Sequence, residues 1–302
     1  MLEPVSCRSV SPIFVGRQYE LARLRAAFAR SAAGEPQTVL VGGEAGIGKT
    51  RLVEEFCSRL DAVVAVGACI ELGSGDGVPF APFVAALRSL DGRGLIDRES
   101  WEGRELARIL PELGEAPARR QEDDYASVRL FEAVQAALLK ASAGRPLVLV
   151  ADDLHWADRA SRELFGYLAR VSRGGSVLMV GTFRSDELHR GHPLRPFLAG
   201  LDRVRGVERL ELERFDRAQT ALQLRGILGE APAPEVVEEV YCRAEGNAFF
   251  TEEVACGVAE GGGLELSWSL RDLLMARVEK LPELTQRLLR LLARPCSRCT
   301  RR

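Results

Sequence analysis

Short apolar runs alternate with amphipathic stretches through the first two thirds of the chain. The runs that predict buried strands lie at 38–41, 62–69, 147–151 and 176–182. Continuous apolar runs of this length are typical of parallel strands that are covered on both faces. Between the runs, apolar residues recur every three or four positions, as at Leu21, Leu24 and Phe28, which predicts helices. Strands that alternate with helices indicate an α/β protein with a parallel sheet and flanking helices.

The pattern changes after a last predicted strand at 207–212. Asp216 begins one amphipathic helix, Pro234 precedes a second, and 249–257 forms a third after Gly246. Helices without intervening strands predict a small all-helical lid that follows the sheet. The expected organisation is a loose tail at 1–12, a core at 13–206, the last strand and lid at 207–262, and a further segment at 263–302.

One motif follows the first predicted strand directly. The residues Gly43, Glu44, Ala45, Gly46, Ile47, Gly48, Lys49 and Thr50 fit G-x-x-x-x-G-K-[ST] at every fixed position, and Arg51 continues into a helix. The glycines let backbone N–H groups converge on phosphate oxygens at the helix N-terminus. Lys49 adds a positive charge for the β- and γ-phosphates, and the Thr50 hydroxyl can ligate Mg²⁺. The stretch therefore predicts a site for ATP or ADP with magnesium.

Two carboxylates end the apolar run at 147–151. Such a strand delivers acids to the carboxyl edge of the sheet, where α/β folds bind ligands. We expect Asp152 to hold the Mg²⁺ shell and Asp153 to orient or deprotonate a water; the alternative is that both residues only cap a helix. Arg184 follows the next strand and can read the γ-phosphate, unless it is a simple surface arginine. Lys49, Asp153 and Arg184 are the candidate catalytic residues.

The amino-acid composition limits the classes of protein to which this chain can belong. The 302 residues suggest about two domains, and 46% hydrophobic with 28% charged residues is typical of a globular chain. A net charge of −2 gives no general attraction to nucleic acid. The sequence has no apolar run of about 18 residues and no leader pattern, so we expect a cytoplasmic protein. Seven scattered cysteines favour reduced thiols over a disulfide framework.

Five short segments occur together in a fixed order. They are Phe14–Arg17, the phosphate loop, Asp152–Asp158, Gly181–Arg184 and Glu245–Asn247. The set resembles the STAND branch of AAA-type P-loop ATPases, and most closely the ATPase region of large ATP-binding LuxR-family transcriptional regulators. The resemblance covers about residues 13 to 290, and the string Leu-His-Trp-Ala-Asp at 154–158 makes it specific.

The resemblance implies a molecular switch. Relatives of this kind have an ADP-bound resting form and an ATP-bound signalling form that self-associates. By the same resemblance, Val15 and Arg17 border the adenine, Arg184 is the sensor arginine, and the lid closes over the nucleotide. The family's usual proline is replaced by Ala248, which removes one expected contact with the base. The family also continues into a winged helix and a C-terminal helix-turn-helix, so 263–302 resembles the truncated start of a winged-helix region.

The leading hypothesis is a Mg·ATP-binding signalling switch with slow ATP hydrolysis, the regulatory ATPase part of a LuxR-type transcriptional regulator. One alternative is a nucleotide-binding interaction module without turnover, and another is a P-loop phosphotransferase. We expect no sequence-specific DNA binding by this chain, because its predicted helices are assigned to the core and lid. His155 and Trp156 are expected to pack the start of a helix rather than to transfer protons.

Overall fold

The computed structural model describes residues 11–71, 77–117, 126–171, 174–259, 278 and 283–292. It divides into two compact units. One unit is Arg17–Glu213, and the other combines Met1–Gly16 with Arg214–Arg302. The predicted tail at 1–12 lies mostly outside the described residues, and so does the predicted segment at 263–302.

A five-stranded parallel sheet forms the centre of the larger unit. The strands are β1 (Gln37–Gly42), β2 (Val63–Ala68), β3 (Leu147–Asp152), β4 (Val177–Thr182) and β5 (Val207–Glu211). Their order is β2-β3-β4-β1-β5, and every pair is parallel. This confirms the predicted α/β class. Because β5 pairs with β1, the last strand belongs to the sheet, and the unit ends just beyond it at Glu213.

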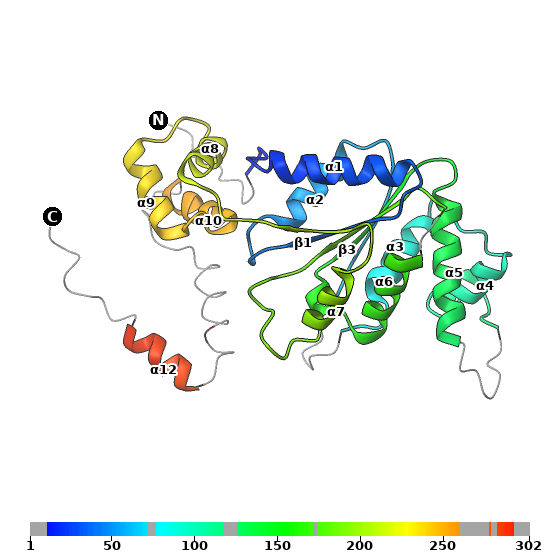
Figure 1. The fold of residues 1–302 in the computed structure, drawn as a ribbon. Coiled ribbons are helices and arrows are strands. Elements are labelled where there is room, and N and C mark those ends of the chain that lie inside the picture. The colour runs from blue at the N-terminus through cyan, green and yellow to red at the C-terminus, as the bar shows by residue number, and fades with distance from the viewer. Residues whose placement is uncertain are drawn as a thin grey trace. The chain divides into compact units, whose positions relative to one another are not determined.

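Helices cover both faces of this sheet (Figure 1). On one face lie α1 (Gln18–Ala32) and α2 (Lys49–Ser58). On the other lie α3 (Ala81–Asp91), α5 (Ala126–Ala141), α6 (Arg159–Val171) and α7 (Leu194–Leu201), and α4 (Trp101–Leu106) packs on α5. Two 3-10 turns, η1 (Pro111–Leu113) and η2 (Leu154–Trp156), complete the unit. Because helices cover the faces of the sheet, polar side chains that could bind a ligand lie at the ends of its strands.

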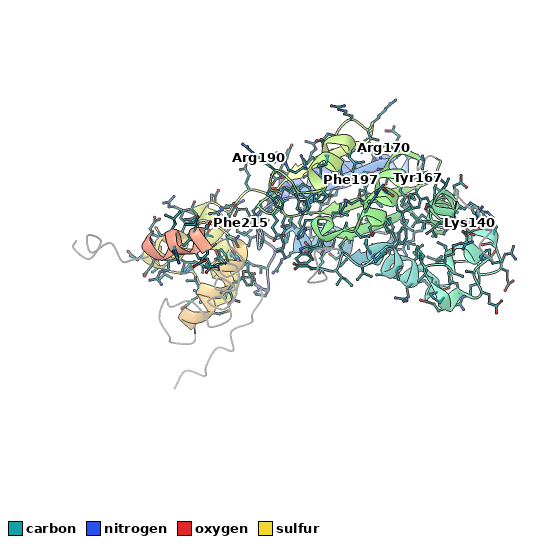
Figure 2. All side chains as sticks on the ribbon, turned by 90° about the horizontal axis from the view of Figure 1, so that it is seen from below. Lys140, Tyr167, Arg170, Arg190, Phe197 and Phe215 are labelled. Atoms are coloured by element: carbon teal, nitrogen blue, oxygen red, sulfur yellow. The ribbon has the colours of Figure 1, made fainter. Side chains whose placement is uncertain are left out.

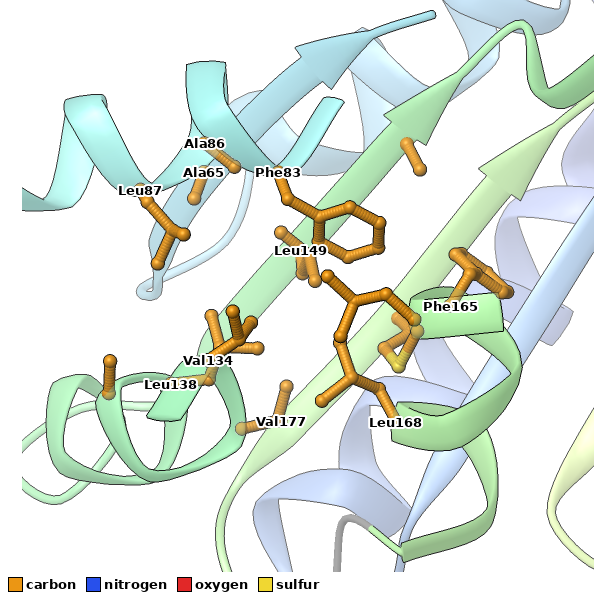
Figure 3. Close-up of a cluster of buried hydrophobic side chains, with 14 of the residues drawn as sticks. Ala65, Phe83, Ala86, Leu87, Val134, Leu138, Leu149, Phe165, Leu168 and Val177 are labelled. Atoms are coloured by element: carbon orange, nitrogen blue, oxygen red, sulfur yellow. The ribbon is translucent and has the colours of Figure 1, made fainter. Parts of the chain in front are cut away.

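The main hydrophobic core lies between the sheet and the helices α3, α5 and α6 (Figure 3). Phe83 of α3, Val134 of α5 and Phe165 of α6 are at most 1% exposed and meet Leu149 of β3. Burying each large apolar side chain contributes about 1.5–3 kcal/mol relative to leaving it in water. The strand that delivers the two acids is therefore fixed on a rigid layer.

Gly166 lets α6 and α7 pack closely. A Cβ added there would lie 3.0 Å from Phe197 Cε2 of α7 and 2.8 Å from Arg170 Nη1. Figure 2 shows Phe197, Arg170 and Tyr167 near one another on these helices. A larger residue there would have to displace the Phe197 ring and the Arg170 guanidinium, so glycine favours the close approach of the two helices.

The strand β2 differs from the prediction. Its apolar run, placed at 62–69, indicated a strand covered on both faces, but β2 is at the edge of the sheet and Val66 is 51% exposed. α3 covers one face of β2, and the side chains of Val64 and Val66 line an open apolar pocket of about 370 Å³ beside α2. An apolar run predicts a strand but does not reveal whether neighbours cover it, which explains the error.

The smaller unit is helical, as predicted for the lid. Its helices are α8 (Arg217–Leu228), α9 (Pro234–Ala244), α10 (Ala248–Ala259) and α12 (Glu283–Leu292). Leu224, Val240, Val254 and Ala255 form the core between α8, α9 and α10. Asn247 is 2% exposed, and its Oδ1 accepts hydrogen bonds from the N–H groups of Phe249 and Phe250 at the start of α10.

The structure also bears on the expectations about cysteines and about membrane-spanning segments. Cys57, Cys69 and Cys242 have free thiols, whereas Cys256 is in a disulfide, contrary to the expectation of reduced thiols, because sequence spacing does not reveal which thiols meet in space. Within the part of the chain that the structure describes, no helix has both the length and the apolar character needed to span a membrane.

Candidate functional site

The phosphate loop connects β1 to α2 at the carboxyl edge of the sheet. Its three glycines have positive φ, with Gly43 at 148°, Gly46 at 77° and Gly48 at 100°. Residues with a Cβ rarely adopt these angles. At Gly43 an added Cβ would also lie 2.9 Å from Cγ2 of Ile47, which is itself buried. The backbone is thus wound tightly and ends at the N-terminus of α2, which no side chain caps at Gly48.

Lys49 is the first residue of α2 and is folded back into the loop. Its Nζ donates hydrogen bonds to the carbonyl oxygens of Gly43 and Glu44, both at 2.8 Å, and the residue is only 7% exposed. Burial, and then the charge of Arg184, lowers the pKa of Lys49. The loop therefore holds the buried Lys49 ammonium group against its own carbonyl groups. Phosphate oxygens of a bound nucleotide can take the place of these carbonyl groups as hydrogen-bond acceptors.

The other predicted residues of the loop differ in exposure. Glu44 and Ala45 are half-buried, Gly46 is exposed, and Arg51 is half-buried on the first turn of α2. Ile47 anchors the loop in the core, and its carbonyl oxygen accepts a hydrogen bond from Arg17 Nη2 at 3.1 Å. The predicted loop residues thus come together as one structural unit.

Arg17 combines an unusual backbone conformation with a buried side chain. It has a left-handed backbone with φ 65° and lies just before α1, and its side chain is 6% exposed. Burial lowers its pKa, while the neighbouring Glu20 opposes that shift. The guanidinium thus braces the phosphate loop through Ile47. Val15 is buried and belongs to the smaller unit.

A row of hydrogen bonds links Thr50 to the two acids. The Thr50 hydroxyl donates to Asp152 Oδ2 at 3.1 Å, and the buried Thr182 hydroxyl donates to Asp152 Oδ1. The same Thr182 oxygen accepts the backbone N–H of Asp153 at 2.9 Å. β4 lies between β1 and β3, so its last residue, Thr182, reaches both acids and holds the Asp152 carboxylate and the Asp153 backbone.

Asp153 has an unusual backbone and an unusual charge environment. Its φ of 58° and ψ of 47° are left-handed, a conformation that costs about 1–2 kcal/mol for residues other than glycine. Burial, and then the neighbouring Asp152, raises the pKa of Asp153, while Arg184 and Lys49 act against that rise. A carboxyl group with a raised pKa is a better proton acceptor near neutral pH.

Arg184 follows β4 and stays next to the phosphate loop. The chain is held there because Phe183 N–H donates to Val41 O at 3.0 Å and Ser185 N–H donates to Gly43 O at 3.2 Å. The guanidinium donates to Glu187 Oε1 at 2.6 Å and lies 4.7 Å from the centre of the Trp156 ring. Both contacts hold Arg184 within reach of the loop.

Sequence reasoning did not single out Glu187, and it expected His155 only to pack the start of a helix. It also did not foresee the contacts of Thr182 with both acids. The spacing of Glu187 three residues after Arg184 was a usable signal for the ion pair. Asp158 caps the start of α6, since its carboxylate accepts the N–H groups of Ala160 and Ser161.

Comparison with known proteins agrees with this geometry. Residues 13–180 match the AAA ATPase domain family, which is over half of the chain. The chain belongs to the AAA ATPase domain family. It is therefore a nucleotide-binding domain, and the phosphate loop described above lies within the matched region.

Individual relatives of this AAA ATPase domain are distant. An uncharacterized protein of Rhizobium meliloti (strain 1021) is 27% identical over 215 residues, which is 62% of this chain and 20% of that protein. A Walker-type ATPase of Pyrococcus abyssi has a TM-score of 0.60 at 14% identity, with 96% of this chain and 81% of that chain covered. This likeness shows the fold. A STAND protein with a tetratricopeptide repeat sensor from Pyrococcus horikoshii has a TM-score of 0.48 at 18% identity, covering 96% of this chain and 36% of its own.

Proposed function

We propose that this AAA ATPase domain is a Mg·ATP-binding signalling switch that hydrolyses ATP slowly. The observation that carries the proposal is the continuous hydrogen-bonded row from Thr50 through Asp152 and Thr182 to Asp153. It aligns a candidate metal ligand and a candidate water-orienting acid beside a complete phosphate loop. Binding of Mg·ATP without turnover would use Asp152 but would not need a water-orienting acid at Asp153.

Thr50 and Asp152 are the residues that would hold Mg²⁺. Their oxygens meet at 3.1 Å, and a hydroxyl with a carboxylate is the hard donor set that this ion prefers. Mg²⁺ usually binds one or two carboxylates together with substrate phosphates and water. When bound, the ion would neutralise charge on the β- and γ-phosphates.

Asp153 is proposed to prepare a water molecule for attack on the γ-phosphorus. The water oxygen forms a bond to phosphorus, and the bond from phosphorus to the bridging β-phosphate oxygen breaks. ADP leaves with the electron pair, and the water proton passes to the Asp153 carboxylate. The raised pKa of that carboxylate suits this role. Lys49 would stabilise the charge on the β- and γ-oxygens.

Arg184 is proposed as the element that reads the γ-phosphate. Its guanidinium is held by Glu187 and Trp156, and a phosphate group would compete for the same donors. ATP therefore has a contact that ADP lacks, and differential contact is what a switch requires. We infer by the STAND resemblance that the ATP-bound form self-associates and that Val15 and Arg17 border the adenine.

The wider role is proposed from the sequence motifs. We propose that the domain is the regulatory ATPase part of a LuxR-type transcriptional regulator and that this chain alone does not recognise a DNA sequence. A gel-shift series over random and promoter DNA tests the second statement. Tight binding to one sequence that survives about 200 mM salt would contradict it, because nonspecific phosphate contacts weaken steeply with salt.

The decisive experiment measures ATP binding and phosphate release together. We expect Mg²⁺-dependent turnover that EDTA abolishes. Asp153→Asn should lower turnover by about 10²–10⁴-fold with unchanged affinity, as expected for loss of a general base. Asp158→Asn is the matched control, since asparagine caps a helix as well as aspartate does. Binding without turnover would indicate an interaction module, and transfer of the phosphate to an acceptor would indicate a phosphotransferase.

A further inference from the structure

His155 has a buried ring at the centre of the candidate site. It lies in η2, its side chain is 0% exposed, and its ring centre is 4.6 Å from that of Trp156. Neither ring nitrogen has a hydrogen-bond partner among the described residues. Buried polar groups are nearly always hydrogen-bonded, so this ring requires an explanation other than packing.

Two carboxylates face the two nitrogens of this ring. Nδ1 is 3.7 Å from Asp153 Oδ1, and Nε2 is 3.5 Å from Glu187 Oε2. The other oxygen of Glu187 accepts the hydrogen bond from Arg184. The ring therefore lies between the acid proposed to prepare water and the pair proposed to read the γ-phosphate. A movement of under about 1 Å would bring either carboxylate within hydrogen-bond distance.

The ring is neutral and has one proton to donate. Burial, followed by the charges of Arg184 and Lys49, lowers the pKa of His155 to about 3. A neutral imidazole has one N–H donor and one acceptor nitrogen. It can donate to only one of the two carboxylates at a time. Glu187 already has a cationic partner in Arg184, so Asp153 is the carboxylate that gains from the donor.

We propose that His155 is a positioning residue for ATP turnover, which holds the Asp153 carboxylate through its single N–H. The proposal rests on the proposed function. His155 itself neither gains nor loses a proton in the reaction. Its contribution is to fix the direction of the Asp153 oxygens toward the attacking water.

The test compares variants of His155 that keep different parts of the ring. His155→Phe keeps the stacking on Trp156 and removes both nitrogens. In His155→Asn the amide lies near the position of Nδ1, and in His155→Gln it lies near Nε2. His189→Phe is the matched control, because His189 is exposed in the loop after β4. Each variant is measured for thermal unfolding, ATP affinity and kcat.

We expect His155→Phe to lower kcat by about 10- to 100-fold with unchanged affinity, since a misplacement of about 1 Å can cost about 10²-fold. His155→Asn should restore most of the loss, and His155→Gln should not. In an Asp153→Asn background, His155→Phe should have no further effect, because coupled residues are not additive. A purely structural role would give additive losses and equal Asn and Gln variants, and either result would overturn the proposal.

Other outcomes separate this inference from the proposed function. If His155→Phe fails to fold, the contrast between the Asn and Gln variants decides alone. If the wild-type chain has no Lys49-dependent ATP binding, the proposed function is wrong. If the wild-type chain turns over ATP and all His155 variants match it, only the inference about His155 is wrong. If ATP binds without turnover, the inference is overturned together with the hydrolytic part of the function.

Discussion

The helices α2 and α8 begin in opposite ways. At α8, Asp216 accepts the N–H of Gln219 at 2.7 Å, and the Gln219 side chain accepts the N–H of Asp216 at 3.0 Å, which forms a complete capping box. At α2 no side chain caps the helix, and the preceding Gly48 has a left-handed backbone. One helix start is completed by its own sequence and the other is not.

The missing cap makes the start of α2 less stable but leaves it free to bind a ligand. A good N-cap stabilises a helix by about 0.5–2 kcal/mol, and α2 does without one. The positive end of the helix and its N–H groups are then available to an anion. Lys49 and Arg184 add positive charge at the same edge of the sheet. A ligand-binding helix start is thus recognised by the cap it lacks as well as by its motif.

Removing the positive charge at the start of α2 should have the largest effect of these variants on ATP binding. We expect Lys49→Ala to weaken ATP binding about 10- to 100-fold, because hydrogen bonds to charged groups are worth about 1.5–3 kcal/mol. The control is Arg59→Ala at the other end of the same helix, where Arg59 pairs with Glu55. Titration calorimetry measures both. Undiminished binding by Lys49→Ala would mean that α2 is not the phosphate site.

Alanine at two glycines separates backbone strain from binding. Gly48 before α2 and Gly229 after α8 have φ of 100° and 80°, and an added Cβ would meet no atom within 4 Å at either position. Gly48→Ala and Gly229→Ala should each cost about 1–2 kcal/mol of unfolding free energy through the left-handed conformation. Denaturant unfolding measures that cost. Only Gly48→Ala should also weaken ATP binding, and equal effects of both variants on affinity would contradict the comparison.

Arg184 tests whether the charge near α2 distinguishes ATP from ADP. Arg184→Ala should reduce the ratio of ATP to ADP affinity by about tenfold, which corresponds to one lost charge-assisted hydrogen bond of about 1.4 kcal/mol. Arg190→Ala is the control, since this arginine is exposed in the same connection (Figure 2). Competition of both nucleotides against a fluorescent analogue gives the ratios. A wild-type ratio in Arg184→Ala would leave this residue without a sensing role.

Removing the N-cap of α8 should have the smallest effect of these variants. Asp216→Ala should lower the free energy of unfolding by about 1 kcal/mol. ATP affinity should not change, because the capping bonds lie within α8. Asp216→Asn serves as the control, since asparagine is an equally good cap. Thermal unfolding of the three proteins tests this, and a weaker ATP affinity in Asp216→Ala alone would show that the cap also serves binding.

The motifs and the helix starts could be predicted because they depend on neighbours in sequence. The phosphate loop from Gly43 to Thr50 needs glycines at fixed spacing, and the caps at Asp158 and Asp216 act on N–H groups two or three residues away. The contacts of Arg17 with Ile47 and of Thr182 with both acids join residues about 30 positions apart. Such contacts depend on strand order, which no local pattern contains.

The sequence by itself determined the α/β class, the phosphate loop, the acids at the end of β3 and the helical character after residue 213. Local backbone preferences and hydrophobic periodicity are sufficient for these features. Only the tertiary structure decided that β4 lies between β1 and β3, that β2 is an exposed edge, and that His155 lies between Asp153 and Glu187. These features arise from the parallel pairing of strands far apart in the chain, because side chains meet only after the whole sheet has formed.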